Sequence, residues 1–91
     1  MKSRSNRKIL LERFEELAAK LGIIISYERG LEGPGGLCRI KDQNMILINR
    51  NLTVQDKIDV IVDSIIQFPL DNHYILPELR EYLENASPKI E

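Results

Sequence analysis

Two stretches of this chain repeat apolar residues with the same helical spacing, and this pattern constrains the fold more than any other feature. The first stripe, at i, i+4, i+7, i+8 and i+11, consists of Leu10, Phe14, Leu17, Ala18 and Leu21. The second, with the same spacing, consists of Val54, Ile58, Ile61, Val62 and Ile65. Such a stripe follows one side of an α-helix and is buried against a neighbouring element. The sequence therefore predicts two long amphipathic helices, over residues 5–20 and 53–68.

Three short β-type runs lie between these helices. Residues 23–27 read Ile-Ile-Ile-Ser-Tyr, and the three isoleucines suggest burial on both faces at the start of a strand. Residues 37–41 and 45–49 flank a polar Asp-Gln-Asn turn at 42–44, which is typical of a β-hairpin. Four of the five glycines fall within residues 30–36, so this segment is predicted to be a loop. We expect the three strands to form one antiparallel sheet.

Capping residues mark the predicted helix ends. Ser3 or Ser5 is a candidate N-cap for the first helix, and Gly22 suits the left-handed position after its end. Thr53, with Asp56 three residues later, starts the second helix, and Pro69 ends it at the preceding residue. A short third helix begins at 77, where proline suits the first position; its inner face consists of Leu79, Tyr82 and Leu83.

These elements predict a single α+β domain over residues 1–91, with both apolar stripes on one face of the sheet. The predicted order is an N-terminal helix, a three-stranded antiparallel sheet, a second long helix and a short C-terminal helix. Residues 1–4 and 87–91 are expected to be flexible. A chain of 91 residues is the usual size of one domain.

Charge and cysteine content exclude several classes of function. The net charge is −1, so no overall field attracts nucleic acid or an anionic membrane. The charge is nevertheless uneven: residues 1–45 carry nine Lys/Arg and six Asp/Glu, whereas residues 46–91 carry four and eight. A single cysteine permits no internal disulfide and no multi-cysteine zinc site. No apolar run approaches the roughly 20 residues that a membrane helix needs, so we expect no membrane contact. We also expect a cytoplasmic protein that uses no cofactor.

Few residues have the chemistry of a catalytic site. Cys38 lies in a predicted strand, and the single histidine, His73, lies in a polar loop between helices. A nucleophilic cysteine needs a histidine, a cation or a helix N-terminus nearby to lower its pKa, and the sequence places none there. One alternative is therefore an enzyme that uses Cys38 with a remote His73 or Asp63. The sequence favours instead a core cysteine and no catalytic or metal-binding residues.

The leading hypothesis is a binding module that interacts with a protein partner or with itself. Its candidate contact residues lie in two loops and are Gly30, Gly33, Gly35, Gly36, Asp71, His73 and Tyr74. Self-association would pair an edge strand or cover the apolar residues outside the two stripes, such as Ile9, Leu11, Val60 and Ile66. A further alternative is weak nucleic-acid binding through the basic N-terminus, which carries Lys2, Arg4, Arg7 and Lys8. The aspartates of the second helix, Asp56, Asp59 and Asp63, are interpreted as a solvated face.

Two short motifs resemble a small, uncharacterised bacterial protein family. They are Gly-Gly-Leu-Cys-Arg at 35–39 and Leu-Pro-Glu-Leu-Arg at 76–80. The layout is also similar to the core of zinc metallopeptidases of the ImmA/IrrE type, in which a strand ending in Asn leads into a helix bearing His-Glu-x-x-His. On that alignment Val62, Asp63 and Ile66 occupy the positions of the first His, the Glu and the second His. The resemblance thus implies a zincin-like scaffold without its metal ligands.

Overall fold

The computed structural model describes residues 6–86, which form three helices and one three-stranded sheet. Their order and bounds are α1 (Asn6–Lys20), β1 (Ile24–Glu28), β2 (Gly35–Ile40), β3 (Gln43–Asn49), α2 (Val54–Ile65) and α3 (Pro77–Ala86). The predicted α+β class and element order are confirmed. The proposed caps at Ser3 or Ser5 and the segments expected to be flexible lie outside the described residues.

The sheet is mixed, so the prediction that all strands are antiparallel is wrong in one pairing. The strand order is β1-β3-β2. β2 and β3 form the expected antiparallel hairpin, but β3 then inserts beside β1 and runs parallel to it. The chain must therefore pass the end of β3 on its way from β1 to β2. The prediction failed because it assumed that each strand pairs with the one before it in the sequence.

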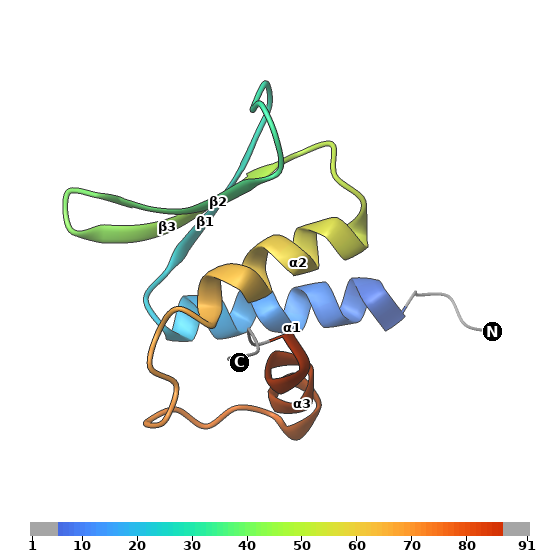
Figure 1. Cartoon of the computed structure of the whole chain (residues 1–91), viewed down its shortest axis with the longest axis vertical. Helices are drawn as coiled ribbons and strands as arrows, with labels where there is room; N and C mark the ends of the chain where they lie inside the picture. Colours follow the sequence, from blue (N-terminus) through green and yellow to red (C-terminus); the bar gives the residue numbers. More distant parts are fainter. Residues whose placement is uncertain (1–5, 87–91) are drawn as a thin grey trace, which may run out of the picture.

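Both long helices cover the same face of the sheet, as the two stripes predict. In Figure 1 the sheet lies along the upper side of α1 and α2, and α3 lies below them. The side chains between the layers are fully buried and include Phe14, Ile46, Ile48, Ile58, Ile61 and Ile65. α3 is held through Tyr82, whose ring meets Phe14 of α1 edge-on at 5.5 Å and whose hydroxyl accepts a hydrogen bond from Gln55 of α2. Among residues 6–86, no helix has the length and apolar character that a membrane crossing requires.

The helix ends follow the predicted capping signals, except at the end of α2. Gly22 has a φ of 79°, the left-handed conformation expected after α1. The backbone N–H of Asp56 donates to the Thr53 hydroxyl, which caps α2. α2 ends at Ile65 rather than near Phe68. The Phe68 N–H bonds to the carbonyl three residues back, so the chain tightens into a turn just before Pro69.

The β2–β3 hairpin turns at Lys41 and Asp42 rather than at residues 42–44. Both turn residues have positive φ angles, 50° and 67°, which suit the two-residue turns that join twisted strands. β2 begins at Gly35, so two glycines assigned to the preceding loop belong to the strand. The Asn49 amide fastens the remaining loop, because its Nδ2 donates to the carbonyls of Leu31 and Gly33.

A cluster of three side chains, one each from α1, β1 and α2, lies at the side of the core. The Tyr27 hydroxyl donates to the Glu15 carboxylate, and the Lys57 ammonium lies 5.4 Å from the centre of the Tyr27 ring. Burial, the hydrogen bond to Glu15 and the charge of that carboxylate together raise the pKa of Tyr27 well above its ordinary value.

We expect this raised pKa to make stability depend on pH in the alkaline range. In the unfolded chain Tyr27 ionises near pH 10, whereas in the folded chain it stays protonated. Its contribution is therefore complete below about pH 10 and is lost as the pH rises further. In Tyr27→Phe, urea unfolding should show a loss of about 1 kcal/mol at pH 7 and a shallower alkaline decline than in the wild type. Parallel alkaline declines in the two proteins would contradict this.

Glycine is required at position 35 because the backbone there lies too close to β3 to leave room for a side chain. Gly35 has a φ of 114°, and a Cβ built there would lie 2.0 Å from the Leu47 carbonyl oxygen. Gly36→Ala is the matched control, since a Cβ at Gly36 meets nothing within 4 Å. We predict that Gly35→Ala lowers the free energy of unfolding by more than about 2 kcal/mol, whereas Gly36→Ala changes it by less than about 1 kcal/mol. Equal effects in urea denaturation would show that β2 does not approach β3 in this way.

Candidate interaction site

The two faces of the sheet have different surroundings. Because side chains alternate along a strand and paired residues share a face, Ile25, Leu37 and Ile46 point to the helices. The opposite side, which we call the outer face, consists of Ile24, Ser26, Glu28, Gly36, Cys38, Ile40, Gln43, Met45, Leu47 and Asn49. Neither α1, α2 nor α3 covers this side in Figure 1.

Half of the ten outer-face positions carry apolar side chains, namely Ile24, Cys38, Ile40, Met45 and Leu47. Ile24 and Ile40 are 49% and 50% exposed, and together with Tyr74 they are the large hydrophobic residues that the described chain leaves exposed. Glu28 is the one charged residue among the ten positions, and its carboxylate accepts a hydrogen bond from the Ser26 hydroxyl. The expectation that the isoleucines of 23–27 are buried on both faces is therefore wrong for Ile24. Because no helix packs on the outer face, this isoleucine remains in contact with solvent.

The structure does not bring the candidate catalytic residues together. Cys38 is half-buried on the outer face. Figure 1 places β2 and the segment between α2 and α3, which carries His73, on opposite sides of the α1–α2 layer. Asp63 is exposed on α2. The arrangement therefore offers Cys38 no imidazole partner from within the described chain.

The positions aligned with the zincin ligands have no ligand geometry. Val62 is buried in the core at 2% exposure, and Ile66 packs against that core. Asp63, between them in sequence, faces solvent. Within residues 6–86, no three side chains of the His, Cys, Asp and Glu types are grouped so that they could hold a metal ion.

The predicted contact loops lie at different places on the molecule. Gly30 and Gly33 are exposed in the β1–β2 crossover, at the end of the sheet. Asp71 and Tyr74 are exposed and His73 is half-buried in the segment that joins α2 to α3. The two loops therefore do not form one continuous site.

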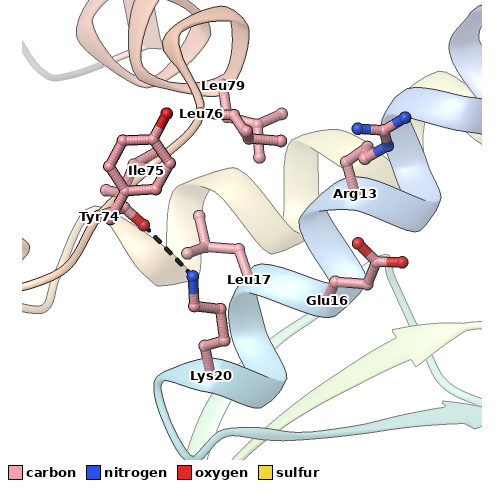
Figure 2. Close-up of a pocket in the computed structure, with 8 residues that line it drawn as sticks. All are labelled: Arg13, Glu16, Leu17, Lys20, Tyr74, Ile75, Leu76 and Leu79. Atoms are coloured by element: carbon pink, nitrogen blue, oxygen red, sulfur yellow. Dashed lines mark hydrogen bonds between the residues drawn. The ribbon is translucent and has the colours of Figure 1, made fainter.

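Tyr74 borders a shallow depression between α1 and the segment before α3. Figure 2 shows its apolar floor, which includes Leu17 and Leu79, and Lys20, which donates to the Tyr74 carbonyl at 3.4 Å. The depression measures about 210 Å³. Pockets for small molecules usually hold at least about 300 Å³, so this depression is too small for such a ligand. A hollow of about 440 Å³ lies between the starts of α1 and α3, but its walls carry no catalytic pair.

Two of the apolar residues suggested as a self-association surface are not available for contact. Leu11 and Val60 are buried in the core, while Ile9 and Ile66 are half-buried. Both buried residues belong to the hydrophobic core that the helices and the sheet share. At the N-terminus, Lys2 and Arg4 lie outside the described residues, and Arg7 and Lys8 are exposed at the start of α1.

Sequence reasoning missed the outer face as a candidate site. The continuous apolar run Met45–Ile48 is compatible with a strand buried on both sides, and it does not reveal which face lacks a cover. The search for polar loop residues also directed attention elsewhere. The number of predicted long helices was a usable signal. Two long amphipathic helices are enough to cover one face of a three-stranded sheet, and the sequence predicts no further long helix for the other face.

Comparison with known proteins adds no relative to this geometry. No protein-family model matches the chain, and neither does any curated protein or solved structure.

Proposed function

We propose that this chain is a non-catalytic protein-interaction module and that a protein partner covers the outer face of its sheet. The observation that carries the proposal is the apolar surface formed by Ile24, Cys38, Ile40, Met45 and Leu47 on the side that α1, α2 and α3 leave uncovered. Contiguous apolar patches of this kind on a small domain mark sites of interaction with other proteins.

The completeness of the opposite side supports the same proposal. The inner face, α1, α2 and α3 enclose a core in which Ser64, the buried polar residue, donates to the carbonyl of Val60. No buried polar side-chain atom within residues 6–86 lacks a hydrogen-bond partner. The outer face is therefore not needed to complete the core, and its apolar side chains remain available for a partner.

The scaffold part of the proposal is a zincin-like core without metal ligands, acting in the cytoplasm. It is supported by the order of elements, in which a helix and three strands precede α2, and by β3, which ends at Asn49 shortly before that helix. Val62 and Ile66 have no atoms that can coordinate a metal. A fold of this kind can keep a binding surface after the chemistry of its ancestors has been lost.

The test compares two variants, one with a new carboxylate on the outer face and one with a new carboxylate elsewhere on the surface. A partner is first identified by cross-linking in the source cells and is then purified and titrated with the chain by calorimetry. Ile24→Glu should weaken binding by more than about tenfold, because the carboxylate would be desolvated in the interface. It should change the free energy of unfolding by less than about 1 kcal/mol, since Ile24 lies outside the core.

Asn72→Glu adds the same charge in the exposed segment between α2 and α3 and is the matched control. It should leave the affinity for the purified partner unchanged. If Asn72→Glu weakens binding and Ile24→Glu does not, the partner uses the loop around residues 71–74 and the assignment of the outer face is wrong.

A further inference from the structure

β2 forms an edge of the sheet whose backbone groups have no partner within the described chain. The Asn49 N–H donates to the Pro34 carbonyl, so the groups of residue 34, and at every second residue those of 36, 38 and 40, point to β3. The groups of Gly35, Leu37 and Arg39 therefore point away from the sheet. None of the turn, loop and cap hydrogen bonds among residues 6–86 reaches them. Such an edge is a template for an added strand.

A row of carboxylates is exposed on α2, the helix that contacts β2. We call it the acidic ridge; it consists of Asp56, Asp59 and Asp63, all exposed. At 100° per residue, Asp63 lies about 160° around the helix from buried Ile65. α2 contacts β2 and β3, whereas α1 contacts β1 and lies on the other side of α2. Because the strand order is β1-β3-β2, α2 is the helix on the side of the free β2 edge. The ridge lies on the surface of α2 opposite its buried residues.

We propose that an extended basic segment of a partner protein adds to β2 as a fourth strand. Its lysine or arginine side chains on the helix side lie over the acidic ridge, and its alternate side chains are apolar and extend the outer face. This inference rests on the proposed function and names the chemistry of the partner. The charges of the ridge select a cationic strand, and the backbone groups of Gly35, Leu37 and Arg39 select an extended one.

The acidic ridge also opposes pairing of β2 with a second copy. Two copies joined at β2 by antiparallel pairing would form one continuous sheet with both α2 helices side by side on the same face. Their ridges would then face each other with three carboxylates each. Like charges in such positions repel each other, so the acidic ridge disfavours pairing of β2 with the β2 strand of a second copy.

The size of the outer face supports contact at the edge as well. Three strands of about six residues span about 14 Å by 20 Å, which gives roughly 300 Å². A stable interface takes about 800 Å² from each partner. A partner that binds stably must therefore extend beyond the outer face, and the neighbouring β2 edge offers unpaired hydrogen-bonding groups.

The experiment uses a fluorescein-labelled, end-blocked peptide of seven residues in which lysine alternates with valine. We expect fluorescence anisotropy to show binding to the full chain that weakens as ionic strength rises. Asp59→Asn/Asp63→Asn should weaken it about tenfold. Glu81→Gln/Glu84→Gln, which removes two exposed carboxylates from α3, should leave it unchanged. A peptide with glutamate in place of lysine should not bind.

Two further measurements test the strand itself. N-methylation of the peptide at the alternate residues that face β2 should abolish binding, and the peptide should slow amide hydrogen exchange at Gly35, Leu37 and Arg39. Binding that survives N-methylation, or amide exchange that slows only in α2, would overturn the inference. The peptide would then bind through charge attraction alone, without adding a strand to β2. Failure of the peptide combined with loss of a purified partner in Ile24→Glu would refute the basic strand while upholding the outer face as an interaction site.

Discussion

The packing of both long helices on one face of the sheet is the constraint on which the rest of the structure depends. The stripes of α1 and α2 enclose Phe14, Ile46 and Ile48, and α3 closes the far side of the same helix layer. Each fully buried aliphatic side chain contributes roughly 1.5–3 kcal/mol, so this single core accounts for the folding of a chain of this length. Because α1, α2 and α3 all lie on one side, the helices within residues 6–86 leave the other side of the sheet open.

The connection between β1 and β2 determines which parts of the sheet remain free. By crossing the end of β3, it places the most buried strand in the centre and leaves β2 at an edge. Asn49 holds this crossover through its amide, and Gly35 lets β2 approach Leu47 closely enough to pair. The positions that shape the crossover thus also create the free β2 edge.

The sequence predicts the local elements well because their signals are local. The spacing of the stripes, the left-handed Gly22 and the Thr53 cap each depend on interactions within a few residues, and all three occur in the structure. Strand order depends on contacts between distant segments, and no local pattern states that β3 inserts beside β1. The same limit explains Ile24, since a run of three isoleucines does not show which side of a sheet lacks a cover.

The candidate site was less predictable than the fold for a related reason. Residue-type reasoning searches for polar, reactive or flexible positions, and it selected Cys38, His73 and the loops that carry glycine. The outer face consists instead of residues that are ordinary core formers anywhere else. Met45 and Leu47 lack a covering helix, whereas their neighbours Ile46 and Ile48 are buried beneath the helices. Only the positions of the helices relative to the two faces of the sheet reveal this difference.

The central claim is that the outer face is open to solvent in the free protein, and methyl NMR with a soluble paramagnetic agent tests it most directly. We expect strong relaxation enhancement for the methyl groups of Ile24 and Ile40, and little for those of Ile46 and Ile48 on the inner face. Equal protection of all four residues in the isolated chain would contradict it, because the outer face would then already be covered.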